Sequence, residues 1–293
     1  MKQRKNSGIF GKVLLIIFCA VLLIAIIWGI GQAVIKIKQY AENTSISAEN
    51  TEHDDSEAES ALPAENVLPR NTYKSSGFYE ENGIRFYKAE GMIGRAGIDI
   101  SAFQPSVDWV QVKEAGIEFV MLRLGYRGYA TGELDLDDCF LKHIDGALEA
   151  GLDVGIYFFS QALTPEEAVE EAEYVITWLE GYDISYPVAF DWEEVDVPAR
   201  TDNMNMLNLT ACAEAFCRTV EEAGYEASVY FNQAYGYEQL NLVSIRDYGF
   251  WLAEYAESPT FAYDFAMWQY TNEGSVPGIE GPVDLNICFE ATE

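Results

Sequence analysis

The sequence predicts an α/β fold for its larger, C-terminal part, because strand-like and helix-like apolar runs alternate from Gly97 onward. Eight of these runs have the character of strands, and eight strands suggest a closed barrel. The segments between the early strands are long enough for helices, whereas the later connections are short. We therefore expect an irregular TIM-like (β/α) barrel of eight mostly parallel strands, with reduced helices in its second half.

An apolar segment at residues 13–35 precedes the predicted barrel. It contains no charged residue and is long enough to cross a hydrocarbon core of about 30 Å as one transmembrane helix. Four basic residues lie in the tail 1–12, and only Lys36 and Lys38 follow the span closely. The positive-inside bias therefore predicts a single-pass protein of the cell membrane, with a cytoplasmic N-terminus and an extracellular C-terminal domain. A secretory signal peptide is the alternative, although its apolar region is usually only about 7–15 residues long.

Residues 36–72 are expected to form a disordered, acidic linker. Eight acidic residues and no Lys or Arg lie between Tyr40 and Pro69, with few large apolar side chains, so this segment cannot bury enough surface to fold. Residues 73–94 then predict a small β-hairpin, because two short aromatic runs flank Asn82-Gly83, a strong turn signal. The barrel domain is assigned to residues 95–293.

The predicted barrel strands lie at residues 97–101, 119–124, 154–160, 187–193, 227–231, 250–254, 266–270 and 283–286. Helices are predicted between the early strands, at residues 108–115, 136–150, 165–178 and 205–223. The third helix has the clearest start, since Thr164-Pro165-Glu166-Glu167 supplies an N-cap, a proline at the first helical position and an acidic first turn.

Composition excludes several classes of function. The chain has 48 acidic and 18 basic residues and a net charge of -30, which argues against nucleic acid as a partner because phosphate neutralisation needs Lys and Arg. No cysteine or histidine spacing suggests a zinc site, and the acidic residues lack the spacing of a calcium loop, so neither metal nor cofactor is expected. An exported location permits a disulfide, but the spacing of Cys212 and Cys217 favours buried free thiols.

The segment Tyr186-Pro187-Val188-Ala189-Phe190-Asp191-Trp192-Glu193 ends an apolar run with two carboxylates two residues apart. Side chains alternate along a strand, so Asp191 and Glu193 share one face, with their backbones roughly 6–7 Å apart, while Trp192 faces the other way. Desolvation of such a pair favours one protonated member, as a general acid requires. A solvated acidic strand end is the alternative interpretation.

Two further aspartates change the balance between these interpretations. Asp99 lies in the first predicted strand and Asp284 in the last, and these strands are neighbours in a closed barrel. Each aspartate alone would more often be a cap or turn residue. Together with Asp191 and Glu193, however, they could meet at one mouth of the barrel, which is the arrangement that glycoside cleavage needs.

Seven short segments resemble, in the same order along the chain, the motifs of one known family. They are Gly97-Ile-Asp-Ile-Ser-Ala-Phe-Gln104, Val107-Asp-Trp109, Phe119-Val-Met-Leu-Arg-Leu-Gly-Tyr126, Gly155-Ile-Tyr-Phe-Phe-Ser160, Val188-Ala-Phe-Asp-Trp-Glu193, Met267-Trp-Gln-Tyr270 and Val283-Asp-Leu-Asn286. Together they resemble the family 25 glycoside hydrolases, which are N-acetylmuramidases, or lysozymes of the Chalaropsis type. Each motif is weak alone, whereas seven in order are specific, and they cover residues 97 to about 288.

The resemblance implies hydrolysis of the β-1,4 bond between N-acetylmuramic acid and N-acetylglucosamine in peptidoglycan. The family's proton donor falls on Glu193 and its companion on Asp191, while the first-strand and last-strand aspartates fall on Asp99 and Asp284. Such cleavage needs a proton for the leaving oxygen and negative charge or a nucleophile near the anomeric carbon. Retention through acetamido assistance and inversion by an activated water are both compatible with this set.

The family's sugar-contacting aromatic residues fall on Tyr157 and Trp268, and Tyr126 and Tyr270 are further candidates to line the groove. Core packing is an equally good interpretation for each of them alone. In one departure from the family pattern, Phe158 stands where many members have His. The carboxylates are therefore expected to carry the chemistry by themselves.

The predicted function is that of a membrane-anchored peptidoglycan hydrolase whose monomeric catalytic domain acts on glycan strands. The rival is a peptidoglycan-binding barrel that has lost catalysis. A chitinase is disfavoured, because Tyr186 and Ala189 occupy the two earlier acidic positions of the Asp-x-x-Asp-x-Asp-x-Glu run of that family.

Overall fold

The structure is a computed structural model that describes residues 67–89 and 91–292. The predicted tail, the transmembrane segment 13–35 and most of the linker lie outside these residues, and among the described residues no helix is long and apolar enough to cross a bilayer. The last residues of the predicted linker are part of the folded domain, since Leu68 is buried and the backbone N–H of Asn71 donates to the carbonyl of Ala262.

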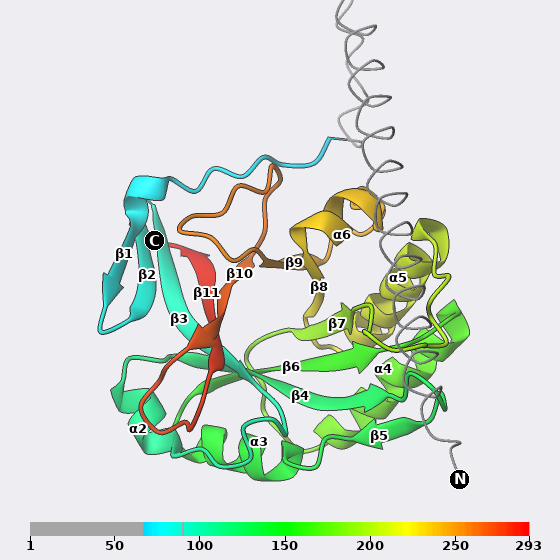
Figure 1. The fold of residues 1–293 in the computed structure, drawn as a ribbon, viewed down its shortest axis with the longest axis horizontal. Coiled ribbons are helices and arrows are strands. Elements are labelled where there is room, and N and C mark those ends of the chain that lie inside the picture. Colours follow the sequence, from blue (N-terminus) through cyan, green and yellow to red (C-terminus); the bar gives the residue numbers. More distant parts are fainter. Residues whose placement is uncertain (1–66, 90, 293) are drawn as a thin grey trace, which may run out of the picture. The chain divides into compact units, whose positions relative to one another are not determined.

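Eight strands close into a barrel in which each strand pairs with the next and the last pairs with the first (Figure 1). They are β3 (Met92–Ile100), β4 (Phe119–Arg127), β6 (Asp153–Ser160), β7 (Val188–Trp192), β8 (Ala227–Asn232), β9 (Gly249–Ala253), β10 (Met267–Gly274) and β11 (Val283–Ala291). Each overlaps a predicted strand. Strand β11 runs antiparallel to both of its neighbours, and the other barrel pairs are parallel. The predicted barrel of eight mostly parallel strands is confirmed.

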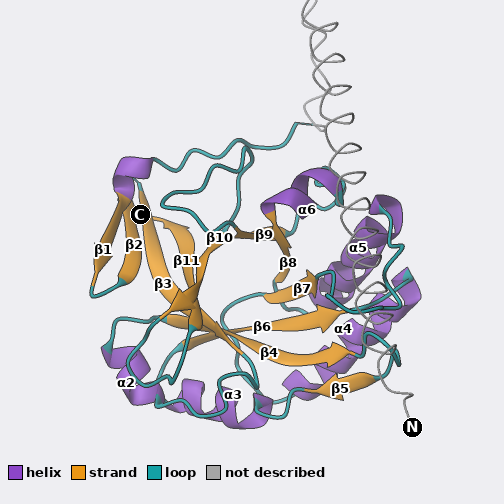
Figure 2. Cartoon of the chain, in the orientation of Figure 1, coloured by secondary structure: helices purple, strands orange, loops and turns teal. Residues whose placement is uncertain are grey.

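Helices cover the early strands and are reduced after β8 (Figure 2). They are α2 (Trp109–Glu114), α3 (Phe140–Glu149), α4 (Pro165–Leu179), α5 (Met206–Glu222) and the short α6 (Gln233–Glu238). The side chain of Thr164 accepts from the backbone N–H of Glu167 and caps α4 as predicted. The predicted helix 136–150 begins later, at Phe140, because residues Leu134–Leu136 form strand β5 along the end of β4.

A hairpin precedes the barrel, as predicted from Asn82-Gly83. It follows a 3-10 turn (Ser75–Gly77) and consists of β1 (Phe78–Glu81) and β2 (Ile84–Ala89), and both turn residues have positive φ, 54° and 81°, as a type I′ turn requires. Strand β2 pairs with the start of β3, so the hairpin extends the sheet. Phe78 packs on Trp268 of β10, on a part of the barrel wall that no helix covers among the described residues.

The interior of the barrel is solid up to the end where the parallel strands finish. A cluster of apolar side chains fills it, consisting of Phe119, Met121, Tyr186, Ala189, Tyr230, Trp251, Ala253 and Met267. Arg95 lies at the end where the parallel strands begin, and its guanidinium pairs with Glu118, Asp153 and Glu290 at 3.2, 2.6 and 3.3 Å. Side chains at the other end therefore stand on a packed floor rather than over a channel.

Candidate active site

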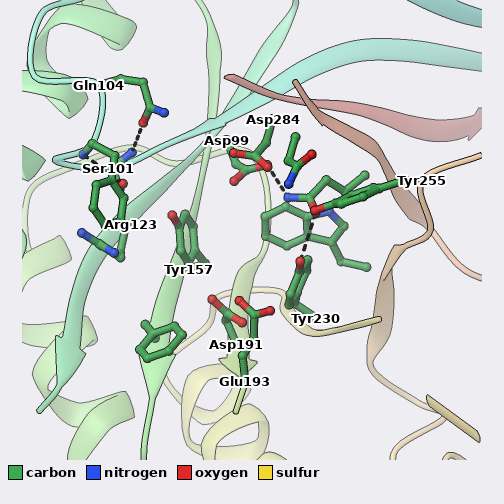
Figure 3. A pocket seen from close by; sticks show the side chains of 15 residues that line it. Asp99, Ser101, Gln104, Arg123, Tyr157, Asp191, Glu193, Tyr230, Tyr255 and Asp284 are labelled. Carbon is green, nitrogen blue, oxygen red and sulfur yellow. Dashed lines mark hydrogen bonds between the residues drawn. The ribbon is translucent and has the colours of Figure 1, made fainter. Parts of the chain in front are cut away.

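A pocket of about 260 Å³ opens at the end of the barrel where the parallel strands finish (Figure 3). Its lining comprises Asp99, Ser101, Phe103, Gln104, Arg123, Tyr157, Phe159, Asp191, Glu193, Tyr230, Trp251, Tyr255, Gln269, Asn272 and Asp284. Side chains from all eight barrel strands contribute, together with residues of the loops that follow some of them. This is the end at which barrel enzymes place their catalytic groups.

The four carboxylates predicted from the sequence all line this pocket. Asp99 and Asp284 are register partners across the antiparallel β3–β11 ladder, so their side chains leave the sheet on the same side. Asp191 is the last residue of β7 that pairs with β8, and Glu193 directly follows the end of β7. Figure 3 shows the Asp191 and Glu193 side chains together on one side of the pocket, facing the Asp99 and Asp284 pair.

Two amides hold the Asp99 carboxylate in place. Its Oδ2 atom accepts a hydrogen bond from Asn286 Nδ2 at 2.8 Å and another from Gln269 Nε2 at 2.9 Å. Both amides are buried, so these bonds are not exchanged with water. Donors on one oxygen favour the ionised carboxylate and fix its plane.

The orientation of both amides is itself fixed by groups behind them. Trp251 Nε1 can only donate, and it lies 2.8 Å from Asn286 Oδ1, which turns the Asn286 NH₂ group toward the carboxylate. The hydroxyls of Tyr230 and Tyr255 donate to Gln269 Oε1 at 3.0 and 3.1 Å and have the same effect on that amide. The aspartate is thus held by a hydrogen-bond network that spans the five strands β3, β8, β9, β10 and β11.

Burial raises the pKa of every carboxyl group of the four, and for Asp99, Asp191 and Glu193 a neighbouring carboxylate raises it further. The pKa of Asp99 is raised by burial and by Asp284, against the effect of its two amide donors. Burial also raises the pKa of Asp284, to about 6. For Asp191 the pKa is raised by burial, then by Glu193 and Asp99, and for Glu193 it is raised by burial and by Asp284. The group as a whole therefore retains protons at a pH where isolated carboxyls would have lost them.

The two members of the Asp191 and Glu193 pair differ in access. Asp191 is 4% exposed, and its Oδ1 atom is buried with no hydrogen-bond partner in the described part of the chain. Glu193 is only partly buried and can be reached from the pocket. Trp192, between them, packs outside the barrel against Tyr235, as strand alternation predicted.

Comparison with known proteins agrees with this geometry. The model of the family described as glycosyl hydrolases family 25 matches residues 98–279. The chain belongs to this family. The match begins in β3, beside Asp99, and extends to the connection before β11.

Curated relatives of this family 25 chain include the autolytic lysozyme of Clostridium acetobutylicum, which is 31% identical over 192 residues. That alignment covers 65% of this chain and 54% of the relative, so the chain spans about half the length of that protein. Lysozyme M1 of Streptomyces globisporus is 26% identical over 243 residues, which cover 76% of this chain and 80% of the relative.

Solved structures share the fold. The modular autolysin LytC of Streptococcus pneumoniae superposes with a TM-score of 0.61 at 23% identity, covering 73% of this chain and 52% of that one. A family 25 glycosyl hydrolase from Bacillus anthracis gives a TM-score of 0.55 at 22% identity, covering 66% of this chain and 88% of that one. At these identities the likeness establishes the barrel architecture.

Two of the predicted aromatic lining residues lie outside the pocket of the family 25 barrel. Trp268 is fully buried on the outer face of β10, where its Nε1 donates to the carbonyl of Glu254 at 2.8 Å and its ring meets Phe78. Tyr270 is beside it, and its hydroxyl accepts from the backbone N–H of Arg85 at 3.0 Å. The prediction for both residues was wrong, because the inward face of β10 carries Gln269.

The other two aromatic predictions have different outcomes. Tyr157 on β6 lines the pocket between Arg123 and Asp191 (Figure 3). Tyr126 does not line it, but its ring lies 5.6 Å from the guanidinium carbon of Arg123, which does. Tyr126 is therefore one side chain beyond the pocket, and a role in a longer groove stays a prediction.

Several lining residues were missed, and strand alternation could have found two of them. Asn286 is two residues after Asp284 and faces the same side of β11, and Gln269 is the polar residue in an apolar run. No comparable sequence signal distinguished Trp251, Tyr230 or Phe103 from core residues.

Phe158, the departure from the family pattern, lies away from the chemistry. Its side chain is fully buried against Tyr174 of α4, on the outer face of β6, and no histidine of the described residues lines the pocket. His143 is 2% exposed and packs against Trp109 under α3. Among the described residues, no group of three His, Cys, Asp or Glu side chains is arranged to hold a metal ion, and Cys212 and Cys217 are buried free thiols.

Proposed function

We propose that this chain is an N-acetylmuramidase that hydrolyses the β-1,4 bond between N-acetylmuramic acid and N-acetylglucosamine in peptidoglycan glycan strands. The observation that carries the proposal is the meeting of Asp99, Asp191, Glu193 and Asp284 in one open pocket. The names of the lysozyme relatives support it, as does a structure of the pneumococcal autolysin with a synthetic peptidoglycan ligand.

Glu193 is the general acid in this proposal. Its pKa is raised by burial and by Asp284, so it holds its proton to higher pH than an isolated glutamic acid does, and its partial exposure lets it reach the leaving oxygen. General acid catalysis contributes about 10²–10⁴-fold to rate. Loss of this proton would therefore stop most of the reaction.

The remaining carboxylates stabilise and orient the substrate. Asp191 lines the pocket, and its Oδ1 atom has no hydrogen-bond partner among the described residues, so the N–H of a 2-acetamido group would satisfy it. Asp99 is held by two amides and supplies negative charge opposite Glu193 as the anomeric carbon becomes cationic. Asp284 is the neighbour that helps keep Glu193 protonated.

The test replaces Glu193 with Gln in the full-length chain and measures new reducing ends on purified cell wall by mass spectrometry. Muramic acid ends from the wild type and at least a hundredfold loss in Glu193→Gln are expected. Glu194→Gln is the matched control, since Glu194 is exposed and does not line the pocket. Glucosamine ends would indicate another glycosidase, no new ends would indicate a binding module, and activity within tenfold of wild type would remove Glu193 from the acid role.

We also propose that the domain acts outside the cell as a monomer, tethered by a membrane span at residues 13–35. The support for the tether comes from the sequence alone. Residues 13–35 are apolar and uncharged over a length that can span a bilayer, and more basic residues precede this segment than follow it closely. Protease added to intact cells should degrade the barrel and leave the N-terminal tail. Release of an intact, shortened protein into the medium would instead indicate a cleaved signal peptide.

A further inference from the structure

Phe103 is the most exposed large apolar side chain of the described residues, at 81%. It belongs to the loop that follows β3 and lines the rim of the catalytic pocket. Single exposed apolar residues are common on protein surfaces and need no explanation when they are free to move. This ring, however, contacts an anchored cation, and its backbone is held by hydrogen bonds.

A fixed cation lies under the ring. The guanidinium carbon of Arg123 is 5.2 Å from the centre of the Phe103 ring, within cation–π range. Arg123 is in turn anchored, because its Nε and Nη2 atoms both lie 2.8 Å from Oδ2 of Asp137, whose side chain is 1% exposed. One face of the ring is therefore supported, while its exposure leaves the opposite face open.

The backbone that carries the ring is tied down as well. The N–H of Ala102 donates to the same Asp137 oxygen at 3.0 Å, and the N–H of Phe103 donates to Ser101 Oγ at 3.2 Å. The side chain of Gln104 reaches the carbonyl of Pro282 at 3.3 Å, across the connection that leads into β11. The loop that carries the ring is thus held in place when the domain folds. Little additional conformational entropy would be lost when a ligand binds to the ring.

The chemistry of the open face selects the ligand. It is an apolar aromatic surface beside a pocket that is lined by four carboxylates, so it fits an uncharged group with a flat C–H face rather than an anion. A pyranose ring of a β-1,4-linked glycan is such a group. The sugar next to the one in the pocket would reach the rim as the strand continues outward.

We propose that Phe103, supported by Arg123, is a stacking platform for a pyranose ring of the glycan strand outside the pocket that holds the cleaved linkage. The proposal rests on the proposed function, since it names a further contact with the same substrate. The platform binds substrate and transition state equally, because it is remote from the reacting bond. Its loss therefore raises KM and leaves kcat unchanged.

The test compares full-length Phe103→Ala and Phe103→Trp proteins with wild type on glycan strands of defined length. Phe103→Ala should raise KM roughly tenfold, keep kcat within twofold and leave the pH profile in place, because an aromatic stacking contact is worth about one factor of ten. Phe103→Trp should retain the wild-type KM. Tyr79→Ala, which removes another exposed ring outside the pocket, is the control and should change neither constant.

A binding measurement separates this proposal from the function itself. Titration of each protein, in the Glu193→Gln background, with a hexamer of β-1,4-linked N-acetylglucosamine should give roughly tenfold weaker binding for Phe103→Ala. That result supports the platform even if the wild type cuts no wall, which would refute only the proposed function. An unchanged KM and hexamer affinity in Phe103→Ala would overturn the platform, and so would a loss of kcat with a displaced pH profile, since the ring would then act through Arg123 on the carboxylates.

Discussion

Replacing Asn286 with Leu should move the pH dependence of catalysis without moving the catalytic groups. Asn286 is completely buried, and leucine has a similar shape but cannot donate to Asp99 Oδ2. The lost bond is a 2.8 Å contact to a carboxylate. Its removal disfavours the ionised form of Asp99, so the pKa of Asp99, already raised by burial and by Asp284, rises further.

The expected size of the shift follows from the energy of such a bond. Hydrogen bonds to charged groups contribute about 1.5–3 kcal/mol, and one pKa unit corresponds to about 1.4 kcal/mol, so the pKa of Asp99 should rise by roughly 1–2 units. If ionised Asp99 is the form that stabilises the cationic transition state, the acidic limb of the kcat/KM profile moves to higher pH by the same amount. The direction is toward higher pH because the ionised Asp99 carboxylate then forms only at higher pH.

The assay is the release of reducing ends from purified wall by full-length protein across the range from acid to mildly alkaline pH. Gln269→Leu removes the second donor and should shift the limb in the same direction. Asn71→Leu is the matched control, because that amide donates to the carbonyl of Phe261 away from the pocket. An acidic limb that stays in place in a folded Asn286→Leu protein, or moves to lower pH, would refute the reasoning.

Three further predictions concern stability. Asp284→Asn should stabilise the fold by up to about 3 kcal/mol at pH 7 and not at pH 3. Because the pKa of Asp284 is raised to about 6 in the folded state, the wild-type protein loses stability as the pH rises from about 4 to about 6, and asparagine does not ionise. Equal melting temperatures of the two proteins at pH 7 would contradict this. Arg127→Met should lower the free energy of unfolding in urea by about 3–5 kcal/mol, because it leaves the fully buried Glu171 without the guanidinium that lies 2.7 Å from its carboxylate. Adding Glu171→Leu should restore much of the lost stability. Arg95→Met should destabilise more at pH 7 than at pH 3, because its three carboxylate partners repel only when ionised; a loss independent of pH would argue for packing alone.

The parts of the fold that the sequence predicted are those with local physical causes. Asn82-Gly83 adopts the positive φ angles that few other dipeptides tolerate, so these two residues were enough to predict the hairpin. Thr164 caps α4 by accepting a hydrogen bond from the backbone N–H of Glu167, three residues later, which is also a local contact. Asp191 and Glu193 were placed correctly because two charges at the end of a buried strand can face only the open mouth.

The error at Trp268 has a different origin. Strands of a closed barrel are buried on both faces, so an apolar run does not reveal which residues point inward. In Met267–Tyr270 the aromatic residues face the hairpin and the amide faces the pocket. What covers the outside of β10 is a segment almost two hundred residues earlier, and nothing within the run itself encodes that contact. The buried polar residue, which needs a hydrogen-bond partner, was the better marker of the functional face.

The direction of β11 decides whether the fourth carboxylate belongs to the site at all. Asp284 is at the start of its strand, so in a parallel strand it would lie at the opposite end of the barrel from Asp99. Only residues 275–282 separate β10 from β11, whereas a crossover between parallel neighbours needs about a dozen residues or more. The short connection therefore requires the reversal, and the reversal brings Asp284 opposite Asp99 at the mouth. Loop length, which the motifs do not record, is thus what unites an aspartate at the start of one strand with carboxylates at the ends of others.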